Sequence, residues 1–134
     1  MQYWLIKSEP DVYSWSDFML EGKAAWEGVR NFQARNNLRQ MQRGDKALFY
    51  HSNIGKEIVG IAEITRTAYQ DPTSADERWV CVDIRPTKML KKPVSLEKIK
   101  AEERLANIGL IKQSRLSVIA LTKDEFDCIC RMGR

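Results

Sequence analysis

The chain has 134 residues, of which 43% are hydrophobic and 30% are charged, a composition typical of one globular domain with a single hydrophobic core. No apolar run approaches the roughly 20 residues that a membrane helix needs. The formal net charge is +4, which excludes a polycationic tail and favours a modest contribution of phosphate contacts to binding. A charge of this size also serves solubility alone.

Cysteine and histidine usage argues against a metal site. Cys81, Cys128 and Cys130 follow no disulfide or zinc spacing, and the chain has one histidine, His51. We therefore expect reduced packing cysteines, no metal and no cofactor. The chain enters a strand-like segment without a charged leader, which predicts that the protein stays in the compartment where it is made.

The N-terminal region is predicted to contain a strand and a short helix. Residues 3–7 are aromatic and β-branched, which is typical of a strand. Ser14 and Asp17 stand at the spacing of a helix cap, and the helix that they open is expected to point Phe18 and Leu20 inward.

A second, basic helix is predicted after residue 31. Its apolar stripe is Ala34, Leu38 and Met41, and Gly44-Asp45 ends it. On the opposite face, arginines recur every four residues and share one side of the helix: Arg35, Arg39 and Arg43.

The middle of the chain predicts consecutive strands. Residues 46–52 are predicted to form a buried strand, because residues 47–50 are consecutively apolar, and residues 57–67 are rich in Ile, Val and Thr. Gly60 indicates a bulge or a close backbone approach. Residues 79–85 alternate, which points Val80, Val82 and Ile84 inward and Cys81 outward.

The C-terminal part adds short helices and a last strand. Ser95 is expected to open one helix, residues 116–121 form the strand, and Thr122 with Glu125 caps the final helix. Because the central strands lack crossover helices, the pattern predicts an α+β fold with a small mixed β-barrel of five to six strands flanked by short helices.

Two polar segments stand out as candidate binding elements. Residues 7–10 place a hydroxyl (Ser8) and a carboxylate on a proline-pinned turn, which either presents an acceptor to a base edge or only caps a turn. Residues 26–36 combine aromatic rings, amides and guanidinium groups. Trp26 is either core or a stacking wall. Arg30 offers a planar fork, and Asn31 offers an amide that also suits a helix cap.

Two further segments carry polar groups at strand ends. His51 and Ser52 are neighbours, but adjacent strand residues face opposite sides, and no Gly-x-Ser-x-Gly elbow is present, so a Ser/His hydrolase is disfavoured. Arg115 and Ser117 either reach a phosphate or base edge or form a solvated edge. No phosphate loop, metal pattern or acid/base pair is present. The sequence therefore indicates a pocket without catalytic machinery.

Five of these segments match a known family in order and from one end of the chain to the other. They are residues 3–10 (YWLIKSEP), 26–36 (WEGVRNFQARN), 44–45 (GD), 49–53 (FYHSN) and 114–118 (SRLSV). With them the chain resembles the EVE domain family of the PUA-like superfamily, and is similar to the thymocyte nuclear proteins and their bacterial relatives. The resemblance implies a single EVE domain over residues 1–134 with a PUA-like barrel.

The resemblance also implies a pocket related to that of YTH-type readers, which accept modified nucleobases. It implies modified DNA or RNA as the partner, modified cytosine as the leading ligand, and no conventional catalytic site. Phe32 stands where relatives often carry a tyrosine, so stacking is kept and a hydroxyl is lost. The absence of the N-terminal extension usual in eukaryotic members indicates a bacterial cytoplasmic protein. By matching position, the residues that line or border the pocket are Ser8, Trp26, Val29, Arg30, Asn31, His51, Ser52, Arg115 and Ser117.

Three hypotheses follow from the residues and the resemblance together. The favoured one is a non-catalytic nucleic-acid-binding module. In it the pocket residues and Phe32 hold a modified base, while Arg35, Arg39 and Arg43 contact the backbone. The second is an enzyme that acts on modified bases or nucleotides with His51 as acid/base. The third is a protein-interaction domain that uses the basic helix face.

Overall fold

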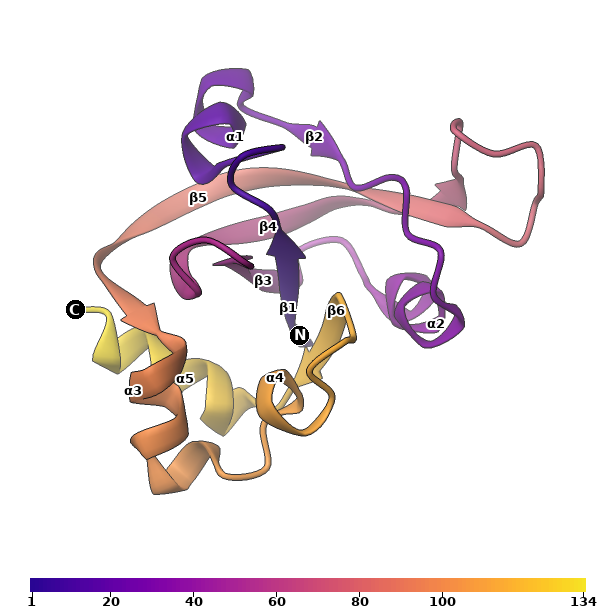
Figure 1. Ribbon diagram of the computed structural model, residues 1–134. Coiled ribbons are helices and arrows are strands. Elements are labelled where there is room, and N and C mark those ends of the chain that lie inside the picture. Colours follow the sequence, from indigo (N-terminus) through magenta and orange to yellow (C-terminus); the bar gives the residue numbers. More distant parts are fainter.

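The computed structural model describes residues 1–134 and contains six strands, five α-helices and one 3-10 helix (Figure 1). In chain order the elements are β1 (Tyr3–Ser8), α1 (Trp15–Glu21), β2 (Ala24–Ala25), α2 (Phe32–Gln40), β3 (Lys46–His51), β4 (Glu57–Gln70), β5 (Val80–Ser95), α3 (Leu96–Ala101), η1 (Glu103–Leu105), α4 (Gly109–Lys112), β6 (Val118–Leu121) and α5 (Lys123–Met132).

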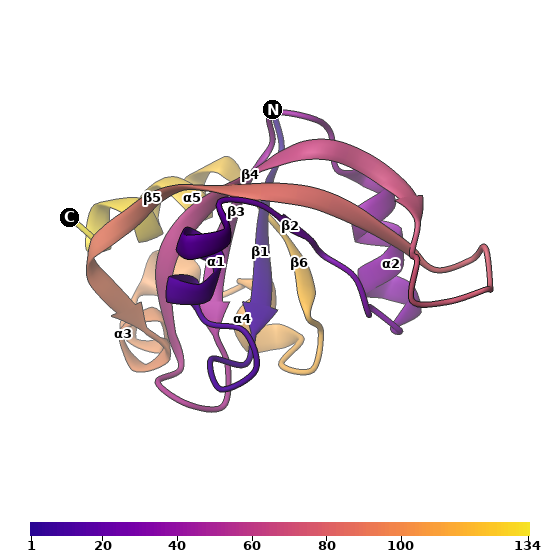
Figure 2. The same ribbon diagram turned by 90° about the horizontal axis from the view of Figure 1, so that it is seen from above.

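The strands form one mixed sheet in the order β2-β5-β4-β3-β1-β6. Only β1 and β3 pair in parallel, with Leu5 opposite Leu48, and the other neighbours are antiparallel. The sheet curves strongly and helices surround it, so the predicted α+β class with a barrel-like sheet of five to six strands is confirmed (Figure 2). The outermost strands, β2 and β6, do not pair with each other, which leaves the sheet open.

The predicted bulge at Gly60 is confirmed, and the glycine lies directly against a tryptophan ring. The register of β3 against β4 shifts between Phe49 and Tyr50, and that of β4 against β5 shifts beside Gly60. A Cβ atom at Gly60 would lie 2.4 Å from the Trp15 ring. Glycine therefore lets the first turn of α1 pack directly on the curved sheet.

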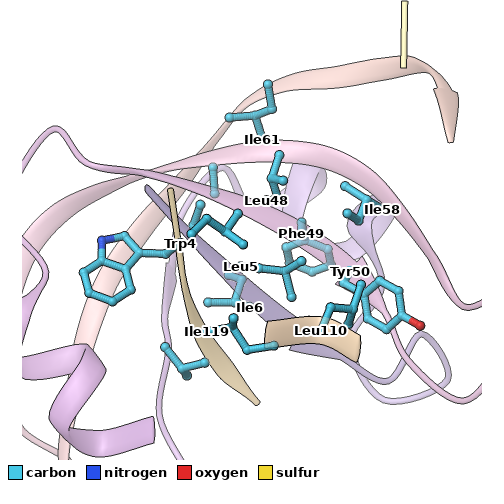
Figure 3. Packing of buried hydrophobic residues seen from close by; sticks show 14 of the residues in the cluster. Trp4, Leu5, Ile6, Leu48, Phe49, Tyr50, Ile58, Ile61, Leu110 and Ile119 are labelled. Atoms are coloured by element: carbon cyan, nitrogen blue, oxygen red, sulfur yellow. The ribbon is translucent and has the colours of Figure 1, made fainter. Parts of the chain in front are cut away.

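One hydrophobic cluster of 34 buried residues fills the inside of the sheet and the helices against it. Leu5, Leu48 and Phe49, which come from the parallel pair β1 and β3, lie at its centre (Figure 3). The three cysteines are free, as predicted, and Cys81 and Cys128 are buried. No helix is long and apolar enough to cross a membrane.

Local cap chemistry sets most helix ends as predicted. The Ser14 hydroxyl accepts from the Asp17 amide at 3.1 Å, and Thr122 and Glu125 form the reciprocal arrangement at α5. Helix α1 is only seven residues long and buries Trp15 and Phe18. Leu20, predicted inward, is 87% exposed, because two residues along a helix turn the side chain to the far side.

The basic helix is shorter than predicted. Helix α2 ends at Gln40, and Met41 already has extended backbone, with φ −66° and ψ 139°. Arg43 therefore lies in the turn that follows and does not continue the helix face of Arg35 and Arg39. The apolar stripe that predicted the helix is confirmed, since Ala34, Leu38 and Met41 are buried.

Strand β5 runs ten residues beyond its predicted end. Pro86 and Pro93 interrupt the apolar pattern of this segment. Strand β2 pairs only with Ile84 and Asp83, so β5 has no strand on its outer edge after Ile84 and tolerates proline there. Cys81, predicted outward, is fully buried. The register against β4 shifts between Arg66 and Tyr69, next to Cys81, and such a bulge breaks the alternation of faces.

Candidate nucleic-acid interface

A pocket of about 560 Å³ lies where β1 ends, between the turn that follows β1, the end of α1 and β2. Ser8 and Trp26, both predicted site residues, belong to it. Its remaining lining residues are Lys7, Glu9, Val12, Tyr13, Glu21, Ala24, Ala25 and Glu27. Three carboxylates and one ammonium group thus surround an apolar floor.

Trp26 forms an aromatic wall of this pocket and is half-buried. Its ring meets Tyr13 edge-on with centroids 6.3 Å apart, and Phe49 with centroids 5.7 Å apart. The Trp26 amide donates to the Val82 carbonyl of β5 at 2.7 Å, which fixes the backbone at this point. One part of this side chain therefore packs on the core and another part faces the pocket, and its role as a stacking wall stays a prediction.

Ser8 and Tyr13 connect the pocket to the turn after β1. Ser8 is 8% exposed, and its hydroxyl donates to the Tyr13 carbonyl at 2.5 Å. The hydroxyl therefore holds the turn closed. The Tyr13 hydroxyl is buried and has no hydrogen-bond partner. Burial and the nearby carboxylates of Glu21 and Asp17 raise the pKa of Tyr13, so the group stays a neutral phenol.

Lys7 links the pocket to a second, shallower hollow. Its ammonium group donates to the Ser114 carbonyl at 2.7 Å, and burial lowers the pKa of Lys7. Ser114 lines a hollow of about 320 Å³ together with Asn31, Gln33 and Arg115. The strand end of β1 therefore brings two predicted residues, Asn31 and Arg115, next to the pocket's edge.

Asn31 has the cap role that its position predicted. Its side-chain oxygen accepts from the Ala34 amide at 2.9 Å and begins α2. The amide nitrogen remains for another partner in the hollow. Ser117 is half-buried, and its carbonyl accepts from the Lys7 amide at 3.0 Å.

His51 and Ser52 lie beside Ser8 but do not line the pocket. His51 is opposite Ser8 in the parallel pair, and the Ser52 amide donates to the Ser8 carbonyl at 2.9 Å. The His51 Nε2 atom accepts from the Trp15 amide at 3.0 Å, at the start of α1. Burial lowers the pKa of His51, although Glu57 acts in the opposite direction. The imidazole is thus neutral and satisfies an amide at a helix start.

Arg30 is held by a buried carboxylate, Asp71, in the loop between β4 and β5. Arg30 donates to Asp71 at 3.0 Å and to the Thr73 hydroxyl at 2.8 Å, and the Gly28 amide donates to the same carboxylate at 2.7 Å. Burial alone would raise the pKa of Asp71, but the hydrogen bonds from Thr73, Gly28 and Arg30 outweigh it and hold the pKa at about 2. Gly28, with φ +83°, makes the turn that presents its amide.

Phe32 lies at this same end of the segment and is 55% exposed. Its ring stacks on Trp79 with centroids 5.1 Å apart and planes 27° apart. The Arg35 guanidinium lies 4.9 Å from the Phe32 centroid, and that of Arg30 lies 5.6 Å from the Trp79 centroid. We call these four side chains, Phe32, Trp79, Arg30 and Arg35, the stacking platform. Arg39 donates to the Arg78 carbonyl at 3.3 Å, in the same loop.

The structure thus distributes the predicted residues over several places. Val29 is 8% exposed and belongs to the hydrophobic core. Arg30 and Phe32 lie at the loop between β4 and β5, and only Ser8 and Trp26 line the main pocket. Sequence reasoning missed Tyr13, Glu21, Asp71 and Trp79. A tryptophan directly after a polar hairpin loop was the one signal that could have drawn attention to Trp79.

No group of His, Cys, Asp and Glu side chains is placed to hold a metal ion. The arrangement offers a different chemistry. An aromatic wall with carboxylates and a hydroxyl nearby can stack a flat ring and accept hydrogen bonds from its edge.

The geometry defines a PUA-like domain with an aromatic pocket, and comparison with known proteins places it in a family. The sequence model of the EVE domain family matches residues 2–132. The chain belongs to the EVE domain family.

Known relatives and solved structures are similar to this chain over almost its whole length. Thymocyte nuclear protein 1 of Mus musculus is 37% identical over 95% of this chain and 71% of its own length. A structure from Rhodopseudomonas palustris is 54% identical, with a TM-score of 0.95, over 99% of this chain and 93% of that one. Human THYN1, crystallised in complex with DNA containing 5-methylcytosine, is 32% identical, with a TM-score of 0.94, over 100% of this chain and 98% of that one.

A more distant likeness concerns the fold alone. The YTH domain of the MRB1 protein from Zygosaccharomyces rouxii is 17% identical, with a TM-score of 0.64, over 99% of this chain and 86% of that one. This likeness shows a shared fold, and the expected relationship of the pocket to that of YTH-type readers stays a prediction.

Proposed function

We propose that this protein is a non-catalytic module that binds nucleic acid by accepting a modified base, with 5-methylcytosine in DNA as the first ligand to test. The observation that carries the proposal is the pocket of about 560 Å³ beside the half-buried Trp26. Its volume is in the range of small-molecule sites. The complex of human THYN1 with DNA containing 5-methylcytosine supports the choice of ligand.

The polar lining suits the edge of a cytosine better than a phosphate. Glu9, Glu21 and Glu27 supply carboxylate acceptors, and the exocyclic amine of cytosine is a donor that carboxylates read. The Lys7 ammonium group adds a donor for the acceptor atoms of the same base, while the Ser8 hydroxyl, which already donates to the Tyr13 carbonyl, keeps only an acceptor. Three carboxylates would repel a phosphate, so the backbone of the nucleic acid must run outside the pocket.

The apolar lining suits a ring that carries a methyl group. Val12, Ala24 and Ala25 lie in the pocket with the rings of Tyr13 and Trp26. Stacking of a base on an aromatic side chain is worth about 1–3 kcal/mol, and one buried methyl-sized group adds about 0.8 kcal/mol. Discrimination of a methylated base from the unmodified one is therefore expected to be several-fold.

The other predicted residues take supporting positions in this proposal. Asn31 and Arg115, in the hollow beside Lys7, border the base site. Arg35 and Arg39 on α2 and Arg43 in the turn after it contact the phosphate backbone. His51 and Ser52 hold the turn and α1 against the end of β1.

The geometry of His51 favours binding over catalysis. An enzyme of the alternative kind needs an imidazole that is free to exchange a proton. The His51 Nε2 atom instead accepts the Trp15 amide, and burial lowers the pKa of the ring. The alternative predicts turnover of a modified nucleoside that His51→Ala abolishes.

The test is a titration of matched single-stranded DNA oligonucleotides, with and without one 5-methylcytosine, against wild type and Trp26→Ala. We expect wild type to bind the methylated strand more tightly and Trp26→Ala to lose most of that preference. Leu20→Ala removes another apolar side chain, 87% exposed on α1, and is the matched control. Equal affinities in all four combinations of strand and protein would contradict the proposal.

A further inference from the structure

The stacking platform does not line the pocket, and we infer that it binds a second, unpaired base of the same strand. This inference rests on the proposed function and names the class of substrate, a strand that is single-stranded next to the modified base. The surface that suggests it is the stacked pair of Phe32 and Trp79. The Arg30 guanidinium lies over the Trp79 ring, and the Arg35 guanidinium lies 4.9 Å from the Phe32 centroid and 5.9 Å from the Trp79 centroid.

Phe32 has no evident role in folding. It is 55% exposed and lies outside the hydrophobic cluster, and helix α2 is anchored by Ala34 and Leu38. Burying a phenyl ring is worth a few kcal/mol, and here much of that free energy is not used. An exposed aromatic ring flanked by cations is the composition of surfaces that bind unpaired bases.

Hydrogen bonds fix the guanidinium groups beside the rings. Arg30 donates to Asp71 and Thr73, and Arg35 donates to the Asn36 side chain at 2.8 and 3.2 Å. Trp79 is itself half-buried, so the platform is set before a ligand arrives. A platform of this kind loses little conformational entropy when it binds. Arg30 is neutralised by Asp71, but the charge of Arg35, which donates to a neutral amide, also attracts the strand that the acidic pocket would repel.

The distance between the two sites limits which base reaches the platform. Six residues separate Trp26 from Phe32, and six extended residues span at most about 20 Å. Stacked nucleotides rise about 3.4 Å each along a strand. The base on the platform is therefore within about six nucleotides of the base in the pocket.

A base can lie on the platform only when it is not stacked between its neighbours in a duplex. An intact duplex is therefore not expected to bind there. A base in a duplex is already stacked on both faces, and freeing it costs a few kcal/mol. The platform thus selects single-stranded or locally opened DNA around the modified position.

The experiment uses a single-stranded DNA with one 5-methylcytosine, in which one abasic site is moved through the six positions on each side. We expect wild type to lose about fivefold to 100-fold in affinity when the abasic site falls on one or two neighbouring positions. Phe32→Ala should weaken binding of the intact strand by a similar factor and abolish the position dependence. Phe32→Trp should retain both.

The preference for the methylated strand separates this inference from the proposed function. Phe32→Ala is expected to leave the ratio of affinities for methylated and unmethylated strands unchanged, while Trp26→Ala removes it. Met89→Ala, which truncates another apolar side chain that is 62% exposed, is the matched control. If Phe32→Ala and Trp79→Ala bind like wild type, or if no abasic position matters, the inference is wrong and the pocket is unaffected. A changed ratio in Phe32→Ala would also overturn it, because the ring would then act on the modified base itself.

Discussion

The two ends of the segment from Trp26 to Phe32 use similar side chains for opposite purposes. At its start, Trp26 packs edge-on against Tyr13 in a pocket with three carboxylates, and its other side packs on the buried Phe49. At its end, Phe32 stacks on Trp79 at the surface, beside two arginines. One aromatic pair is enclosed and faces negative charge, and the other is exposed and faces positive charge.

This difference shows how one short segment separates the two tasks of a base-binding protein. A base is uncharged and can enter an acidic pocket, whereas its phosphates must lie against cations. Asp71 connects the two ends, because it holds both the Gly28 amide and Arg30. If the ends are coupled as the structure indicates, changes at Asp71 affect both.

The largest effect is expected for Asp71→Ala, which tests this connection. Asp71 is fully buried, and its loss leaves the Gly28 amide, the Thr73 amide and Arg30 without their partner. We expect the free energy of unfolding in urea to fall by about 3 kcal/mol. Asp76→Ala removes an ion pair with Arg78 at the surface of the same loop, which should cost much less than the loss of Asp71 because solvent screens the pair. Equal costs would show that Asp71 does not join the two ends.

Truncating the two aromatic side chains sharpens the contrast between the enclosed and the exposed pair. Trp26→Ala removes packing against Phe49 and should lower the free energy of unfolding by about 2 kcal/mol, less than for a fully buried ring because Trp26 is only half-buried. Phe32→Ala should cost less than about 1 kcal/mol, since the ring is 55% exposed. Thermal and urea unfolding measure both. A larger cost for Phe32 would make it a structural residue.

Acid should weaken the contact of His51 with the start of α1 and the contacts of Asp71 in different pH ranges. In the unfolded chain His51 takes up a proton near its ordinary pKa of 6.5, while burial lowers the pKa in the fold. Below pH 6.5 the unfolded state therefore binds more protons, and stability falls as the pH falls. Asp71, with its pKa lowered from 3.8 to about 2, contributes stability above pH 3.8 that is lost between there and pH 2.

His51 is the only histidine, so the change in the free energy of unfolding just below pH 6.5 reports on its protonation. His51→Gln keeps an oxygen acceptor for the Trp15 amide and takes up no proton in this range. The free energy of unfolding of this variant should stay level from pH 7 to pH 5.5, where that of wild type declines. Parallel curves would show that His51 titrates alike in the folded and unfolded chain.

Local signals in the sequence predicted the elements well and the site only in part. The caps at Ser14, Asn31 and Thr122 depend on neighbouring residues, so spacing alone reveals them. The pairing of Arg30 with Asp71 joins residues 41 positions apart and is fixed only when β4 and β5 fold. Without Asp71 in view, residues 26–36 looked like one wall of one pocket.

The smallest effect on the free energy of unfolding is expected for Tyr13→Phe. Whether stability rises or falls shows whether the Tyr13 hydroxyl is free for a ligand or already serves the fold. The Tyr13 hydroxyl is buried without a partner, which is costly, so removing it should leave stability unchanged or raise it by up to about 1 kcal/mol. Tyr3→Phe, at the half-buried ring that packs on Phe126, is the matched control. In the same variant, affinity for the methylated strand should decrease if the hydroxyl turns to a bound base. A Tyr13→Phe variant that is less stable than wild type would show that the hydroxyl has a hydrogen-bond partner in solution. The hydroxyl would then need no hydrogen bond from a ligand in the pocket.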